Sequence, residues 1–229
     1  MLSQSIPSGF LLIEKPAGIT SHDVIDQLRR VTGVQRIGHS GTLDPFATGL
    51  LIVGIGREAT REIDRFLKMD KQYRATLYLG ATSDTGDKTG TIISNLGPSQ
   101  YSPTENIIQE VLKRFTGDIS QVPPMHSAKK VGGKKLYELA RRGKTIERRP
   151  VSISISNLAL VSYTPPLLTI DIACSSGTYI RTLSEDIGNA LGCGAYCQEL
   201  QRTAIGPYRL KDAMELDMIT TENWEQRLK

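Results

Sequence analysis

Apolar residues recur along the chain in spacings that predict strands. Polar and apolar residues alternate over 73–79, 151–155 and 168–173, which is typical of strands with one buried face. Two mostly apolar stretches, 10–14 and 50–53, predict a short strand ending before Pro16 and a fully buried strand. These strands suit a mixed, largely antiparallel sheet.

Apolar residues three and four positions apart predict helices. Val24, Ile25, Leu28 and Val31 form one such stripe, with Ser21 as the predicted N-cap and Gly33 at its end. Ser102-Pro103-Thr104-Glu105 has capping-box spacing with proline at the first helical position, so a helix is predicted from there through Phe115. Further helices are predicted at 135–142, 182–191 and 212–228.

The elements together predict one domain of the α/β class, in the α+β arrangement, with helices flanking the sheet. The 229 residues are enough to bury a sizeable core. The first residues carry no basic leader, and every apolar stretch is too short for a signal peptide or a membrane span, so a cytoplasmic location with no membrane contact is expected. The three cysteines lack paired spacing, which predicts reduced thiols and no metal site.

Positive charge is concentrated in one segment. Between residues 129 and 149 there are nine basic and two acidic residues, a balance of +7, whereas the rest of the chain sums to −3. Such a block is the electrostatic footprint of phosphate binding. A solvated charged helix face explains the charge equally well. The basic residues are Lys129, Lys130, Lys134, Lys135, Arg141, Arg142, Lys144, Arg148 and Arg149.

Gly54-Ile55-Gly56-Arg57-Glu58-Ala59 matches the GxGxxA fingerprint of dinucleotide-binding folds. The next predicted strand alternates polar and apolar residues, unlike the strands of a doubly wound parallel sheet, and no acidic strand end follows at the required spacing. The glycines are therefore interpreted as a tight turn between a strand and a helix. A nucleotide-dependent oxidoreductase would rest on this fingerprint alone.

A stronger motif runs from Gly38 to Leu51 and reads GHSGTLDPFATGLL. Proline after Asp44 restricts the backbone, so that the carboxylate can be held toward a ligand, although a generic Asp-Pro more often makes a turn. As a whole, the motif resembles the active-site motif of the pseudouridine synthases, specifically the TruB family of tRNA pseudouridine-55 synthases.

Further segments resemble motifs of that family in the family's order. They are GFLLIEKPAGITS at 9–21, Lys71-Gln72-Tyr73, LGATSDTGD at 79–87, VPPMHSAKKVGGKKLYELARRG at 122–143, 174–188 and 191–202. The resemblance covers residues 9 to 208 and implies the pseudouridine synthase fold. It also implies that the basic segment, about 122–149, is an inserted RNA-clasping element.

The resemblance implies isomerisation of uridine to pseudouridine in the T-loop of tRNA, without a cofactor. Asp44 is implied as the catalytic carboxylate, which adds to the base or sugar or stabilises a cationic sugar. Arg181 is expected on a strand face with Tyr179, where it would pair with Asp44 and keep it ionised. A surface arginine is the alternative without the family match.

Tyr73 is expected to stack on the flipped uracil and, by resemblance, to take part in proton transfer at C5; a core tyrosine is the alternative. His39 resembles the family's RNA-contacting histidine, although an exposed loop histidine would look the same. Four other residues match the family's motifs, and each could instead have only a local structural role in its loop. Lys15 would contact phosphate or support the Asp44 loop, Asp84 and Asp87 would order a loop near RNA, and Leu200 would line the pocket.

The expected partner is the T stem-loop of tRNA, bound by a monomer. The family's C-terminal PUA domain is not expected here, since the residues up to Lys229 leave room only for a helix. A tRNA-folding chaperone without catalysis is the rival function, and the presence of Asp44, Tyr73 and Arg181 together argues against it.

Overall fold

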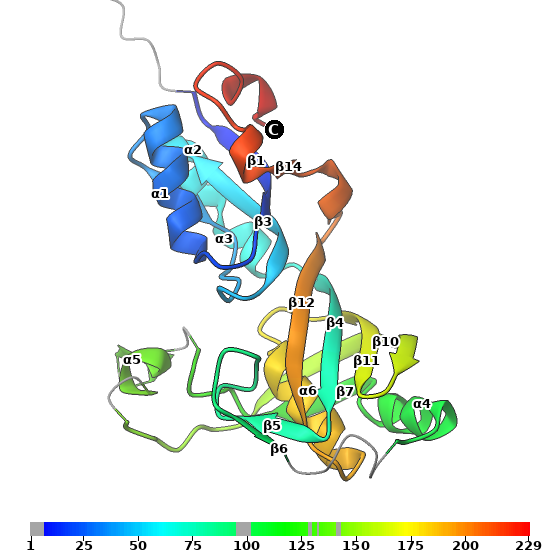
Figure 1. Cartoon of the computed structure of the whole chain (residues 1–229). Helices are drawn as coiled ribbons and strands as arrows, with labels where there is room; N and C mark the ends of the chain where they lie inside the picture. Colours follow the sequence, from blue (N-terminus) through cyan, green and yellow to red (C-terminus); the bar gives the residue numbers. More distant parts are fainter. Residues whose placement is uncertain (1–6, 95–101, 128–129, 132, 141–142) are drawn as a thin grey trace, which may run out of the picture. The chain divides into compact units, whose positions relative to one another are not determined.

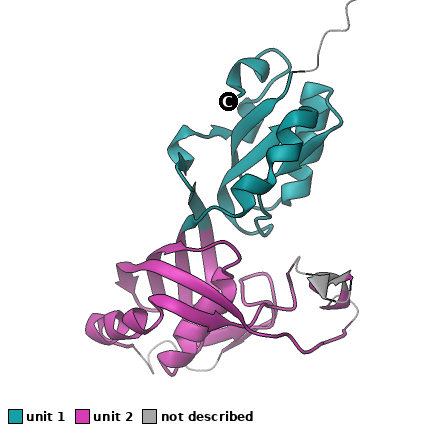
Figure 2. Cartoon of the chain, turned by 180° about the vertical axis from the view of Figure 1, so that it is seen from behind, with its two compact units in different colours: residues 1–72, 201–229 teal, residues 73–200 magenta. Residues whose placement is uncertain are grey.

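A computed structural model describes residues 7–94, 102–127, 130–131, 133–140 and 143–229. The chain divides into two compact units (Figure 2). Unit 1 comprises Met1–Gln72 and Gln201–Lys229, and unit 2 comprises Tyr73–Leu200. Strands β4 (Lys71–Leu79) and β12 (Ala195–Ile205) contribute residues to both units.

Unit 1 is built on the antiparallel pair β1 (Gly9–Lys15) and β3 (Thr48–Ile55). On the outer edge of β1, the short strand β14 (Met214–Glu215) runs parallel to it. Strand β2 (Ile37–His39) pairs antiparallel with β3. Strand β12 pairs parallel with β3 at Gln201 and Arg202. Strand β13 (Tyr208–Arg209) in turn pairs antiparallel with β12.

Both faces of this sheet are buried. Successive residues of β1 point to opposite faces, so they enter two different apolar clusters. Leu11 and Ile13 belong to a core with α1 (Ser21–Thr32), which lies along the sheet in Figure 1. Leu12 faces the other way, into a second cluster with Phe66 of α3 (Asp64–Leu67). Helix α2 (Gly56–Glu62) follows β3 directly, so the glycines of the GxGxxA segment do make a strand-to-helix turn.

The predicted helix over 212–228 is wrong. This segment contains β14 and three short 3-10 turns, η1 (Leu210–Asp212), η2 (Leu216–Met218) and η3 (Glu225–Arg227). Its apolar residues are spaced for a helix, but Leu216, Ile219 and Trp224 each enter the core of unit 1 from an irregular backbone. The chain end is held against β1, because Phe10 and Lys229 exchange backbone hydrogen bonds of 3.0 and 2.9 Å.

Unit 2 contains the strand order β4, β11 (Leu167–Cys174), β10 (Val151–Thr164) and β7 (Gly117–Gln121). The pairs β11–β10 and β10–β7 are antiparallel. Two small hairpins are separate from this sheet. One is β5 (Ala81–Ser83) with β6 (Ile92–Ser94), and the other is β8 (Lys130–Val131) with β9 (Lys134–Lys135), followed by α5 (Leu136–Ala140).

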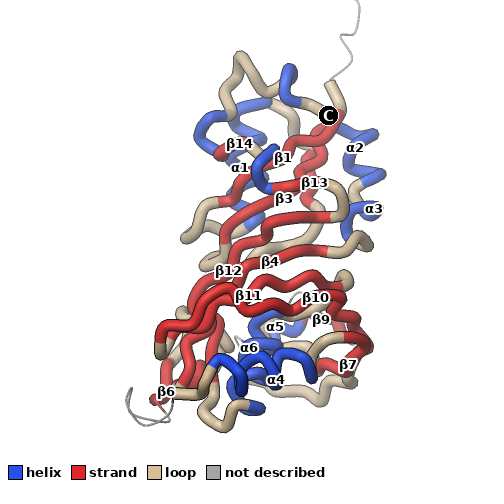
Figure 3. The backbone as a smooth tube through the Cα atoms, turned by 90° about the vertical axis from the view of Figure 1, so that its right-hand side faces the viewer, coloured by secondary structure: helices blue, strands red, loops and turns tan. Residues whose placement is uncertain are grey.

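Two helices of unit 2 pack on each other, α4 (Glu105–Arg114) and α6 (Ile180–Ala190), and α4 also packs on β10 (Figure 3). Their buried faces follow the predicted helical spacing, with Ile108 and Leu112 in α4 and Leu183 and Ile187 in α6. The predicted fold class is confirmed: a mixed, largely antiparallel sheet flanked by helices. Within the described part of the chain, no helix has the length and hydropathy needed to span a membrane.

The N-caps of two helices differ from the prediction. Helix α1 is capped by Thr20 rather than Ser21, because Thr20 and Asp23 make a reciprocal capping box. The Ser21 hydroxyl instead binds the backbone of Leu43. Helix α4 is capped by Thr104, so the predicted cap at Ser102 is wrong and Pro103 precedes the cap instead of opening the helix.

Candidate active-site elements

The Asp44 loop in unit 1 connects β2 to β3 and is fixed on both sides of the carboxylate. The Ser21 hydroxyl accepts a 2.9 Å hydrogen bond from the Leu43 amide and donates one of 3.2 Å to the Leu43 carbonyl. On the other side, the Pro45 carbonyl accepts from the Gly18 amide at 2.8 Å, and the Ala47 amide donates to the Asp44 carbonyl at 3.1 Å. The Asp44 side chain is half-buried at the centre of this braced loop.

Two buried cations support the same loop. Lys15 is fully buried, and its Nζ donates to the carbonyls of Pro16 and Ile19 at 2.7 Å each and to Pro45 at 3.4 Å. Burial lowers the pKa of the Lys15 ammonium to about 8, and the nearby Asp44 carboxylate opposes that shift. Of the two roles predicted for Lys15, these contacts match loop support, because a buried ammonium is not offered to an RNA phosphate.

Arg202, which is 2% exposed, is the second cation. Its Nε donates to the Leu50 carbonyl at 2.8 Å and its Nη2 to the Gly41 carbonyl at 3.1 Å, so it holds both ends of the Asp44 loop. No role for Arg202 is predicted from the sequence. A signal was present, because period-two alternation places it on the same strand face as the buried Leu200 and Ala204.

His39 lies at the end of β2, just before the Asp44 loop, and is half-buried. Burial, helped by the charge of Arg202, lowers the pKa of its imidazole, so the ring is neutral at physiological pH. Its Nδ1 atom is buried and has no hydrogen-bond partner among the described residues. His39 therefore offers a neutral ring beside the Asp44 loop.

Arg181 in unit 2 lies in the first turn of α6, with Tyr179 as the helix N-cap. The expectation that Tyr179 and Arg181 share a strand face is wrong, because the chain turns into a helix at Ile180. Arg181 is 7% exposed, and its Nη1 lies 3.5 Å from Oδ2 of Asp87. Its Nη1 and Nη2 also donate to the Thr85 and His126 carbonyls at 2.7 and 2.6 Å.

The loop between β5 and β6 is ordered by its own carboxylates. Asp87 is buried, and its Oδ1 accepts from the Thr89 amide at 2.9 Å and from the Thr85 hydroxyl at 3.0 Å. Oδ1 of the exposed Asp84 accepts from the Thr91 amide at 2.8 Å. Both residues therefore order the loop, and Asp87 also orients Arg181, a pairing that was not predicted from the sequence.

The other predicted residues of unit 2 occupy varied positions. Tyr73 is half-buried in β4, and Leu200 is buried in β12 at 7% exposure. Lys130, Lys134 and Lys135 lie in the β8–β9 hairpin, whereas Lys129, Arg141 and Arg142 lie outside the described residues. Within the described ranges, no group of three or more histidine, cysteine or acidic side chains is arranged to hold a metal ion.

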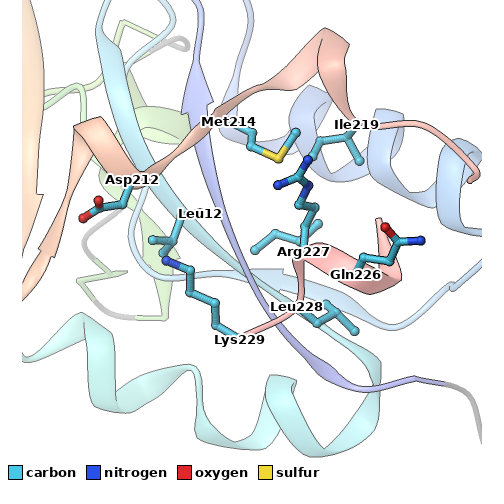
Figure 4. Close-up of a pocket in the computed structure, with 9 residues that line it drawn as sticks. Leu12, Asp212, Met214, Ile219, Gln226, Arg227, Leu228 and Lys229 are labelled. Atoms are coloured by element: carbon cyan, nitrogen blue, oxygen red, sulfur yellow. The ribbon is translucent and has the colours of Figure 1, made fainter. Parts of the chain in front are cut away.

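Each unit contains a cavity among its described residues. In unit 2, a cavity of about 550 Å³ lies between the inserted segment, the β5–β6 loop and α6, and its lining includes Thr85, His126 and Arg148. In unit 1, a cavity of about 380 Å³ lies between β1 and the C-terminal residues, with Leu12 and Met214 among its walls (Figure 4). None of the predicted site residues lines the second cavity.

Two solved structures have a similar fold. One is a chain of a Cbf5–Nop10–Gar1 complex, which is 28% identical to this chain with a TM-score of 0.73. The match covers 93% of this chain and 53% of that chain. An H/ACA RNP bound to a substrate RNA containing 2′-deoxyuridine gives 25% identity and a TM-score of 0.71, with 96% of this chain covering 56% of that one. This chain therefore spans about half the length of those two chains and shares their fold.

Family models and curated relatives make the assignment specific. Residues 29–180 match the N-terminal domain of the TruB family pseudouridylate synthases, and residues 181–229 match the tRNA pseudouridylate synthase B C-terminal domain. The chain belongs to the TruB family. Proteins named tRNA pseudouridine synthase B from Protochlamydia amoebophila and Chlamydia abortus are 48% and 47% identical, over 96% and 93% of this chain and 83% and 89% of theirs.

Proposed function

We propose that this enzyme isomerises uridine to pseudouridine at position 55, in the T-loop of tRNA, with Asp44 as the catalytic carboxylate. Membership of the TruB family and the similarity to proteins named tRNA pseudouridine synthase B support the reaction and the tRNA substrate. The assignment of Asp44 is supported by the structure of its loop. Hydrogen bonds from or to Ser21, Lys15 and Arg202 fix the backbone of this loop around the half-buried carboxylate.

The reaction exchanges one glycosidic bond for another. The bond between C1′ and N1 breaks, the detached uracil turns, and C1′ bonds to C5; the C5 proton leaves to solvent and N1 gains a proton. Atoms and electrons balance within the nucleotide, so no cofactor is required. A carboxylate serves by adding to the base or sugar or by stabilising a cationic sugar.

The other residues of the proposed site assist this carboxylate. We assign Arg181 the part of keeping the catalytic carboxylate ionised, because a guanidinium stabilises the charged form. Tyr73 would stack on the flipped uracil and assist proton transfer at C5. His39 and Tyr179 would contact RNA near the flipped nucleotide. The basic segment 122–149 would bind the phosphates of the T stem-loop, and the enzyme would act as a cytoplasmic monomer.

Release of tritium from tRNA labelled at uridine C5 tests the reaction. The wild-type protein should release tritium, and Asp44→Asn should abolish release while retaining tRNA binding, because asparagine preserves the shape but not the charge. Asp64→Asn is the matched control, since Asp64 is an exposed aspartate of the same unit. Full activity of Asp44→Asn would remove Asp44 from the catalytic role.

The position and the rival function are tested with the same assay. A transcript with cytidine in place of uridine 55 should release no tritium above background, and release from it would show another target. If the wild-type protein binds tRNA but releases no tritium at any salt concentration, the chaperone function is favoured instead.

A further inference from the structure

The inserted segment of unit 2 is joined at its base to the helix that carries Arg181. Gln121, the last residue of β7 before the insertion, is 1% exposed. Its side-chain amide donates to the Tyr179 carbonyl at 3.0 Å and accepts from the Tyr179 amide at 2.8 Å. These two bonds fix the N-terminus of α6 to the end of β7.

The two ends of the insertion are tied to each other by Arg148. The insertion leaves β7 at Val122 and returns just before β10, and Nη1 of Arg148 donates to the Pro123 carbonyl at 3.1 Å. Pro123 is buried and is followed by a second proline, Pro124. Proline has a fixed φ and restricts the residue before it, so the segment that enters the insertion is stiff.

The stiff segment that enters the insertion presents one backbone acceptor to Arg181. The His126 carbonyl, three residues beyond Pro123, accepts from Nη2 of Arg181 at 2.6 Å. Thr85 and Asp87 contact Nη1 of the same guanidinium. One side of the guanidinium is therefore oriented by the β5–β6 loop and the other by the base of the insertion.

We propose that Arg148 is a positioning residue that sets the orientation of Arg181 through the Pro123 and His126 carbonyls. The contacts at the base of the insertion and the geometry of Arg181 are thereby coupled. This inference rests on the proposed function, because it assumes that Arg181 acts in the reaction. It differs from a plain phosphate-binding role for Arg148, in which the residue would contribute charge alone.

Arg149 provides a matched control, because it is the next residue, carries the same charge and is exposed. In single-turnover tritium release at saturating tRNA, Arg148→Met should lower the rate roughly ten- to hundredfold, the scale expected for misplacement of a catalytic group. Arg149→Met shows how far the loss of one charge from the basic segment lowers this rate by itself, and the rate of Arg148→Met should lie well below that of Arg149→Met. The two variants should have tRNA dissociation constants within a factor of about two of each other, since each removes one charge.

Equal saturating rates for Arg148→Met and Arg149→Met would overturn the inference, whether or not both bind tRNA more weakly. If Arg148→Met does not fold, Arg148→Lys against Arg149→Lys decides: a lower saturating rate for Arg148→Lys supports positioning, and equal rates refute it. Failure of the proposed function would look different, because the wild-type protein and the Arg149 variants would then release no tritium.

Discussion

Arg181 and Asp87 form a buried ion pair, with Nη1 and Oδ2 3.5 Å apart and the side chains 7% and 6% exposed. A buried pair stabilises a fold only modestly relative to apolar residues, but loss of one partner leaves an uncompensated charge. Arg181 keeps two carbonyl acceptors, which orient the guanidinium without neutralising it. Asp87 is thus the anionic anchor of Arg181 within unit 2.

Asp87→Asn tests this anchor, because asparagine retains an acceptor for Thr89 while removing the charge. The free energy of unfolding should fall by about 3 kcal/mol, at the low end for breaking a buried pair, and tritium release should slow at least tenfold. Urea denaturation and single-turnover release are the measurements. Asp84→Asn, at an exposed carboxylate of the same loop, should change neither by much. Similar effects from both variants would show a general loop defect instead.

The Lys15 ammonium makes the free energy of unfolding depend on pH. Its pKa falls from the ordinary value of 10.5 to about 8 in the folded protein. Between these values the unfolded chain holds a proton that the folded protein has released, so the free energy of unfolding rises with pH in that window and is lowest below pH 8.

Comparison with Lys15→Met isolates this effect, since the other titrating groups cancel in the difference. The stability of the wild-type protein relative to the variant should rise by on the order of 1 kcal/mol per pH unit from about pH 8 to pH 10. Urea denaturation at several pH values measures it. A difference that stays flat across this window would show that Lys15 keeps its ordinary pKa.

Much of the fold follows from local patterns, because burial on one face leaves a clear period in the sequence. The strands at Gly9–Lys15, Thr48–Ile55 and Leu167–Cys174 and the helix at Ser21–Thr32 lie where alternation and helical spacing predict them. The segment 212–228 shows the limit of such patterns. Its apolar spacing fits a helix, but tertiary anchors and pairing with β1 determine its backbone instead.

The sequence offers candidate residues for the site but does not indicate the contacts that those residues make. The Asp44 motif identified the loop, and support of that loop was one of the two roles expected for Lys15. Nothing local indicates that the Arg202 guanidinium would donate hydrogen bonds to the carbonyls of the same loop. The position of Arg181 in a helix was missed because period-two alternation over a few residues also fits a loop that enters a helix. Long-range partners of this kind depend on the folded chain.

Neutralising Lys134, Lys135, Arg141 and Arg142 together tests the basic segment. Each phosphate contact that is lost removes its share of counterion release, so tRNA binding should weaken and its dependence on salt should become less steep. Filter binding over a range of salt concentrations measures both quantities. Neutralising four exposed basic residues of unit 1, Arg30, Arg36, Arg57 and Arg61, is the control for total charge. Equal slopes for the wild type and the basic-segment variant would exclude the segment from the RNA interface.

Substitution of Gly49 tests how closely the backbone at the end of the Asp44 loop packs against β12. It pairs with Arg202 between β3 and β12, has a φ of +103°, and a Cβ there would lie 2.4 Å from the Arg202 carbonyl oxygen. Gly49→Ala should therefore lower the free energy of unfolding by at least about 3 kcal/mol, through strain and a backbone clash together. Gly18→Ala is the matched control, because Gly18 has a φ of +91° but open space around its Cβ, so about 1 kcal/mol of strain is expected there. Hydrogen exchange of residues 40–50 should rise in Gly49→Ala alone, and equal destabilisation by the two variants would show that Arg202 does not press on the loop.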